Sequence, residues 1–226
     1  MALFRPSAEK TRQKMLRTVP AGPVADYLNV PFPAPETELT ILPLLAIDLE
    51  TTGLDPETDH ILSIGFIPVD GLTIPTGKGQ EIIVRQEAEV GQSATFHGIT
   101  DDEIAAAGVP LSEALAATLQ ALQGRALLAH HADIEVGFIK AACRREFGAE
   151  PTFVVVDTLK LAMDWLMSGD EDVPPKRLRL SALRGQFGLP RYLAHNALID
   201  ALACGELYLA LTAELGQRRL REIWSR

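Results

Sequence analysis

Residues 44–53 read Leu-Leu-Ala-Ile-Asp-Leu-Glu-Thr-Thr-Gly, an apolar run that ends in two acids and a turn. Such a run predicts a buried β-strand over Leu44–Leu49. Side chains alternate along a strand, so Asp48 and Glu50 are expected on one face of a sheet. A divalent cation would relieve their repulsion, since Mg²⁺ and Mn²⁺ prefer oxygen ligands. An isolated Asp-x-Glu pair is more often a solvated strand end, but Gly53 permits a close turn beside the acids and favours a site.

Strand and helix patterns continue on both sides of this run. Ile61–Val69 and Glu81–Arg85 are β-like and complete an antiparallel meander, and Ala126–Ala129 and Thr152–Val156 are short apolar strands. Helices are expected from Thr100 to Gly108, from about Ser112 to Gly124, over Ile134–Phe147, from Thr158 to about Met167 and from near Asn196 to about Leu215. Three antiparallel strands followed by parallel additions predict an α/β fold, a mixed five-stranded sheet flanked by helices.

The composition is that of one soluble domain with an extension. The chain has 226 residues, of which 47% are hydrophobic, enough to bury a core without disulfide staples. Residues 1–43 hold a short basic helix candidate and a proline-punctuated stretch, so we expect an N-terminal arm before a globular domain at 44–226. No apolar segment of bilayer length and no signal-peptide pattern occurs, which predicts a cytoplasmic protein without membrane contact.

The net charge of −9 argues against a protein that coats DNA, because that mode needs many lysines and arginines to neutralise phosphates. It does not exclude an enzyme that grips a few phosphates at a strand end with the help of divalent cations. The two cysteines, Cys143 and Cys204, show no metal-binding spacing and are expected to be buried thiols.

Three later segments carry polar residues in a suggestive order. They are His97-Gly98-Ile99-Thr100, the run from Leu128 to Ile139, and Ala194-His195-Asn196-Ala197-Leu198-Ile199-Asp200-Ala201. In the last, a histidine precedes a helix that carries a carboxylate. Histidine has an unperturbed pKa of about 6.5, so it can accept a proton at neutral pH.

Taken together, these motifs resemble the DEDDh branch of the DEDD exonuclease superfamily, which includes the epsilon proofreading subunit of bacterial DNA polymerase III. The resemblance covers roughly residues 42–213. Its most specific parts are LLAIDLETTGLDP at residues 44–56 and the match of His195 and Asp200 to the HxxxxD signature of the branch. It implies a ribonuclease H-like fold. The segment around His97 resembles the family's lining of the terminal nucleotide's path.

The family's third motif, HNAxFDxxF, admits two alignments here. Matching His130-His131-Ala132 to its start puts Glu135 at the metal-ligand position, and the other candidate is Asp133. We expect Glu135 to be the ligand and Asp133 to be the N-cap of the following helix. A glutamate reaches one methylene further than the family's aspartate, which would move the second metal or favour Mn²⁺ over Mg²⁺.

The resemblance implies 3′-to-5′ hydrolysis of single-stranded DNA or RNA ends, with DNA favoured, to nucleoside 5′-monophosphates with two divalent ions, Mg²⁺ or Mn²⁺. Asp48 would bridge the ions, Glu50 and Asp200 would complete the first site, Glu135 would support the second, and His195 would take the proton from water. The substrate-binding residues that it implies are Thr51, Thr52, Gly53, Leu54, His97 and Ile99.

Two other functions stay open at this point. One is a catalytically impaired nucleic-acid-binding or scaffold protein, which the glutamate at position 135 suggests, although intact Asp48, Glu50, His195 and Asp200 count against it. The other is a polymerase-associated subunit that binds a DNA polymerase through residues 1–43. The sequence leaves the oligomeric state open.

Overall fold

The computed structural model describes residues 8–85, 107–166, 173–193 and 195–225. Its centre is a five-stranded sheet in the order β3-β2-β1-β4-β5. β2 is antiparallel to β1 and β3, whereas β4 and β5 continue the sheet in parallel with β1. The predicted mixed sheet is therefore confirmed. The strands are β1 (Pro43–Thr51), β2 (Ile61–Asp70), β3 (Gln80–Ile83), β4 (Ala126–Ala129) and β5 (Val155–Asp157).

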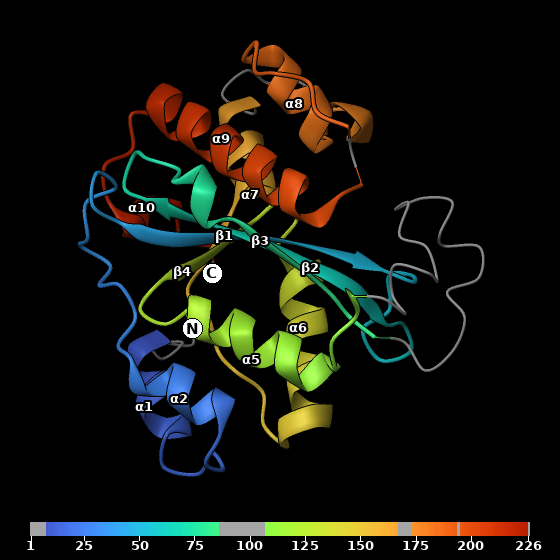
Figure 1. The fold of residues 1–226 in the computed structure, drawn as a ribbon. Coiled ribbons are helices and arrows are strands. Elements are labelled where there is room, and N and C mark those ends of the chain that lie inside the picture. Colours follow the sequence, from blue (N-terminus) through green and yellow to red (C-terminus); the bar gives the residue numbers. More distant parts are fainter. Residues whose placement is uncertain (1–7, 86–106, 167–172, 194, 226) are drawn as a thin grey trace.

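Helices cover both faces of the sheet, with α5 and α6 on one face and α7, α8 and α9 on the other (Figure 1). The helices of the described residues are α1 (Ala8–Met15), α2 (Pro23–Asn29), α5 (Leu111–Ala121), α6 (Asp133–Phe147), α7 (Thr158–Leu166), α8 (Leu180–Gln186), α9 (Ala197–Leu215) and α10 (Leu220–Ile223). The five predicted helices that correspond to α1, α5, α6, α7 and α9 are confirmed, whereas α2, α8 and α10 were not predicted. The helix expected from Thr100 begins outside the described residues.

The N-terminal segment packs onto the helices that cover one face of the sheet. Val24, Tyr27 and Leu28 of α2 are buried in the same hydrophobic core as the strands. The Tyr27 hydroxyl donates a hydrogen bond to the Thr152 carbonyl at 3.2 Å, and Arg12 of α1 donates to the Leu28 carbonyl. The division between residues 43 and 44 stays a prediction, but the described part of the segment contributes side chains to the core.

Helix α9 lies directly on β1 and β2 because small residues line the contact. A Cβ atom at Gly65 would overlap the backbone of Ala197 and Leu198, where α9 begins. A Cβ atom at Gly205 would lie 3.3 Å from Val69 Cγ2. Glycine in a strand interior marks such a close approach of backbones. Since Gly65 is the cross-strand partner of Asp48, the first turn of α9 is held beside the acidic end of β1.

Among the described residues, no helix combines the length and the apolar character that crossing a membrane requires.

Candidate active site

Three carboxylates from two elements meet where β1 ends beneath the start of α9. Asp48 and Glu50 come from β1 and Asp200 comes from the first turn of α9. One carboxylate oxygen of each residue lies within 4.8 Å of the oxygens of the other two. The strand alternation that places Asp48 and Glu50 on one face and the close packing of α9 at Gly65 together produce this arrangement.

A fourth acid, Glu135, lies in the first turn of α6. It is 5% exposed, and its buried Oε2 atom has no hydrogen-bond partner in the part of the chain that the structure describes. The Glu135 charge contributes to raising the pKa of Asp48, so the two groups are near each other. Asp133, the other candidate, has a 78% exposed side chain that lies 3.8 Å from Lys160 Nζ. Glu135 is therefore buried and interacts electrostatically with Asp48, whereas Asp133 is exposed beside Lys160.

The turn before α6 is held by an acid from a neighbouring strand. Ala132 is the N-cap of α6, so the prediction that Asp133 caps this helix is wrong. Asp157, fully buried at the end of β5, accepts hydrogen bonds from the backbone amides of His131 (3.0 Å) and Ala132 (3.2 Å). The Asp157 carboxylate thereby satisfies two backbone amides just before α6 and fixes the turn that carries Glu135.

The neighbouring histidine, His130, has a structural environment. Its Nδ1 atom lies 2.9 Å from Thr158 Oγ1 and its Nε2 atom lies 2.9 Å from the Leu178 carbonyl oxygen. Burial lowers the pKa of His130, which favours the neutral ring. His130 therefore joins the end of β4 to the segment before α8.

Burial is the largest cause of raised pKa values throughout the cluster. It raises the pKa of Glu50 to about 7 and that of Glu135 to about 8. The pKa of Asp48 is raised well above its usual value by burial and by the charges of Glu135, Asp200 and Glu50. Burial also raises the pKa of Asp200. Ionising these carboxylates in the folded protein is therefore unfavourable without a cation. A divalent cation fits them in charge and in its preference for oxygen ligands, and Glu135 Oε2 has no hydrogen-bond partner among the described residues.

These shifts predict a pH dependence for the metal-free protein. Glu50 and Glu135 bind a proton more tightly in the folded protein than in the unfolded chain, where their pKa is about 4.5. Their contribution to stability therefore declines as the pH rises from about 4.5 to the folded pKa of about 7 for Glu50 and about 8 for Glu135. In EDTA, the melting temperature should fall between about pH 5 and about pH 8, and Mg²⁺ should raise it more at the higher pH. Differential scanning fluorimetry checks this, and Glu135→Gln should flatten the decline. A rise in melting temperature with pH in EDTA would contradict the account.

His195 follows α8 and directly precedes the cap of α9. Its backbone is left-handed, with a φ of 71°, and His131 has a similar φ of 68°. The His195 amide donates a hydrogen bond to Asp200 Oδ2 at 2.9 Å, and its side chain is exposed. Asn196 caps α9 through Oδ1, which accepts from the Ile199 amide at 3.0 Å. The main chain of His195 is thus tied to an acid of the cluster.

The loop after β1 contains the other described residues with a predicted substrate role. Thr51 Oγ1 donates to the Gly53 carbonyl at 2.6 Å, and Thr52 Oγ1 donates to Asp59 Oδ1 at 3.3 Å. A Cβ atom at Gly53 would overlap the Asp59 carboxylate, which explains the glycine. Leu54, at 77% exposed, projects from the loop. His97 and Ile99 lie outside the described residues.

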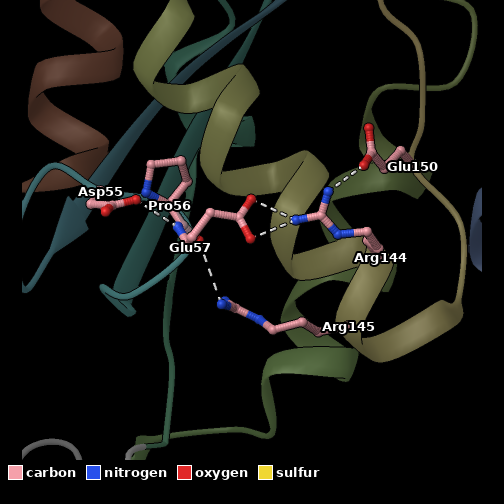
Figure 2. A network of polar contacts seen from close by, with 6 residues as sticks. All are labelled: Asp55, Pro56, Glu57, Arg144, Arg145 and Glu150. Carbon is pink, nitrogen blue, oxygen red and sulfur yellow. Dashed lines mark hydrogen bonds and ion pairs between the residues drawn. The ribbon is translucent and has the colours of Figure 1, made fainter.

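A polar network fastens this loop to the helix that carries Glu135 (Figure 2). Arg144 of α6 makes two contacts with the Glu57 carboxylate, at 2.5 and 2.8 Å, and a third with Glu150 at 2.6 Å. Arg145 donates to the Pro56 carbonyl at 3.4 Å. Exposed ion pairs add little stability, but Arg144 joins the carboxylates of two different segments and so limits how they lie. The network therefore sets how the loop lies relative to α6.

Sequence reasoning missed two residues that shape the site, Gly65 and Asn196, and did not foresee that Asp157 would hold the turn before α6. A glycine within an apolar strand and an asparagine directly before a helix are recognisable signals of close packing and of an N-cap. The hydrogen bonds that Asp157 accepts from the turn after β4 leave no comparable local signal, since an aspartate before a threonine is also typical of a helix start.

Comparison with known proteins extends these findings. The model of the family described as Exonuclease matches residues 45–208. The chain is 31% identical to the DNA polymerase III subunit epsilon of Treponema pallidum, over 74% of this chain and 75% of that protein. It is 26% identical to the DNA polymerase III PolC-type of Thermotoga petrophila, over 79% of this chain but only 13% of that protein. The chain thus spans a small part of the PolC-type relative.

The fold is similar to that of E. coli Exonuclease I in a complex with a dA16 oligonucleotide. The TM-score is 0.67 at 18% identity, over 80% of this chain and 42% of that one. This likeness concerns the fold and confirms the expected ribonuclease H-like arrangement. With a family match that spans most of the chain and 31% identity to an epsilon subunit, the chain belongs to the exonuclease family, in its DEDDh branch.

Proposed function

We propose that the chain is a metal-dependent exonuclease that shortens single-stranded nucleic acid from its 3′ end, with DNA preferred, and releases nucleoside 5′-monophosphates. The observation that carries this proposal is the cluster of Asp48, Glu50 and Asp200 beside the buried, unpaired Oε2 of Glu135. Family membership supports it, as does the oligonucleotide bound to Exonuclease I, a protein of similar fold.

Four residues would hold two divalent ions, Mg²⁺ or Mn²⁺. Asp48 would bridge them, Glu50 and Asp200 would complete one site, and Glu135 would support the other. Bound there, the ions would supply a nucleophilic water and neutralise charge on the phosphoryl oxygens. The raised pKa values of Glu50 and Glu135 support this assignment, because the ionised carboxylates then gain most from a cation.

The substrate's last nucleotide would lie beside the loop after β1. Thr51, Thr52 and Gly53 form its turn, and the exposed Leu54 offers an apolar surface to a base. Such a contact reads no base edge, so binding should not depend on sequence. His97 and Ile99 would line the same path.

His195 would accept the proton of the attacking water. We expect His195→Ala to lower kcat about 10²- to 10⁴-fold, the usual contribution of a general base. Since His195 is not among the proposed metal ligands, the Mn²⁺ affinity of the variant, measured by isothermal titration calorimetry, should stay within about twofold of wild type, a small change in binding free energy. An unchanged kcat would rule out this role.

The proposal is tested with matched DNA and RNA oligonucleotides that carry a 5′ label, incubated with the purified chain and Mg²⁺ or Mn²⁺. We expect a ladder that shortens from the 3′ end, faster on DNA than on RNA, and none in EDTA. Faster cleavage of RNA would overturn the preference for DNA. If both oligonucleotides stay intact with both metals, the exonuclease proposal fails and a nucleic-acid-binding or scaffold role takes its place.

An association with a DNA polymerase is a second candidate, because the relatives include two DNA polymerase III components. The partner would bind residues of the N-terminal segment. Deleting the segment would remove core residues such as Tyr27 and Leu28, so surface variants are the better test. The exposed residues Lys14 and Arg17 suit this purpose. Co-purification of a polymerase that Lys14→Glu/Arg17→Glu abolishes would support the association, and co-purification that is unaffected would exclude α1 as the contact.

A further inference from the structure

The connection that carries His195 is anchored at its start by the main chain of Arg184. Helix α8 ends in a Schellman motif, in which the Leu189 amide donates to the Arg184 carbonyl at 3.1 Å and the Gly188 amide donates to the Gly185 carbonyl at 3.3 Å. Gly188 has a φ of 64°, the left-handed conformation that this motif requires. The direction in which the chain leaves α8 toward His195 is therefore fixed.

The side chain of the same residue joins this connection to α9. Arg184 is 4% exposed, and its Nη2 atom donates to the Pro190 carbonyl at 2.8 Å. Its Nη1 atom donates to the Ala203 carbonyl of α9 at 2.7 Å, and Nη2 lies 2.7 Å from Glu206 Oε2. A buried guanidinium is costly unless it is paired in this way. One side chain thus holds the loop at Pro190 and the middle of α9 together.

Tyr192 adds a second attachment to the same pair of residues. Its hydroxyl donates to Glu206 Oε1 at 3.0 Å, and its ring centroid lies 4.8 Å from Arg184 Cζ. Beyond His195, the Asn196 side chain donates to Glu81 Oε2 on β3 at 2.8 Å. The main chain around His195 is consequently held from both sides, by Arg184 and Glu206 before it and by Asp200 and Glu81 after it.

We infer that Arg184 is a positioning residue for His195: its guanidinium, paired with Glu206, fixes the loop that delivers the imidazole to the acid cluster. This role rests on the proposed nuclease function. A lysine could not replace it, because an ammonium lacks the planar fork that serves Pro190, Ala203 and Glu206 at once. Arg184 lies outside the motifs that carry the family resemblance.

The test compares Arg184→Met, Arg184→Lys and Arg184→Met/Glu206→Gln with wild type and with Arg12→Met. Arg12 is the matched control, a buried arginine at 6% exposure that donates to the Leu28 carbonyl far from the site. We expect each Arg184 variant to lower kcat on single-stranded DNA about 10- to 100-fold, as a misplacement near 1 Å does, with KM changed less than about threefold. Arg12→Met should lower the melting temperature and leave kcat unchanged. The double variant leaves no unpaired buried charge and should melt close to wild type.

Repeating Arg184→Met in a His195→Ala background separates positioning from general damage. If Arg184 acts through His195, the substitution lowers kcat no further there. An equal loss in both backgrounds, or an unchanged kcat in the single variant, overturns the inference. Hydrogen exchange of the peptide at 188–196 provides a readout without catalysis. If the wild type proves inactive, the proposed function fails, but the role of Arg184 in holding the loop can still be tested. Faster exchange in Arg184→Met but not in Arg12→Met would support that role, and unchanged exchange would overturn it.

Discussion

Replacing Asp48 with asparagine is expected to abolish hydrolysis and, at the same time, to raise the melting temperature of the metal-free protein. In the wild type, burial and the charges of Glu135, Asp200 and Glu50 hold the pKa of Asp48 well above its usual value. An ionised Asp48 therefore destabilises the fold in EDTA. An amide of the same shape removes that charge but is a poor ligand for a divalent cation, so the change that helps the fold removes the proposed metal bridge.

The expected loss of kcat is at least about 10³-fold, since metal catalysis supplies several kcal/mol of transition-state stabilisation. A gain in stability on the order of 1 kcal/mol would raise the melting temperature in EDTA by about 2–4 °C for a chain of this length. Scanning fluorimetry with EDTA or Mg²⁺, beside a turnover assay, measures both effects. Asp164→Asn, at an exposed position on α7, is the control and should change neither. An Asp48→Asn protein that Mg²⁺ stabilises as strongly as wild type would contradict the assignment.

Adding a single methyl group at Gly65 is expected to damage the site although Gly65 has no functional group. The new Cβ atom would overlap the backbone of Ala197 and Leu198, so the first turn of α9 must move away from β2. Asp200 lies in that turn, and its carboxylate accepts a hydrogen bond from the His195 amide. Gly65→Ala should therefore separate Asp200 from Asp48 and Glu50.

We expect Gly65→Ala to cost about 1–3 kcal/mol of folding free energy, as overpacking usually does, and to lower kcat about 10²-fold. Chemical denaturation and turnover measurements test the two numbers. Gly77→Ala is the control, because nothing lies within 4 Å of a Cβ atom there. If Gly65→Ala kept full activity, the close packing of α9 would not be what positions Asp200.

The parts of the fold that sequence could predict are those that local patterns determine. The apolar runs of the strands and the alternation at Asp48 and Glu50 led to the sheet and to the shared face of the two acids. Helix α2 was missed because it lies within a proline-punctuated stretch, and its buried side chains, Tyr27 among them, are stabilised by contacts with distant parts of the chain.

The site shows the same limit. Two alignments of the third motif could be stated from sequence, but the burial of Glu135 and the exposure of Asp133 depend on how α6 meets the sheet. Asp133 was expected to cap α6, but Ala132 is the N-cap, and the turn before it is held by the carboxylate of Asp157 from another strand. Arg184 carries no signal in the sequence, because its burial against α9 leaves no mark on the residues around it.

Identification of the released product tests whether the acid cluster hydrolyses phosphodiester bonds at a 3′ end. Single-stranded DNA would be incubated with the purified chain and Mg²⁺, with an EDTA reaction beside it, and the small products would be separated and weighed by mass spectrometry. We expect nucleoside 5′-monophosphates that accumulate with time and are absent in EDTA, as metal-dependent hydrolysis from the 3′ end requires. Products cut internally, nucleosides with a 3′-phosphate, or an intact substrate would contradict it.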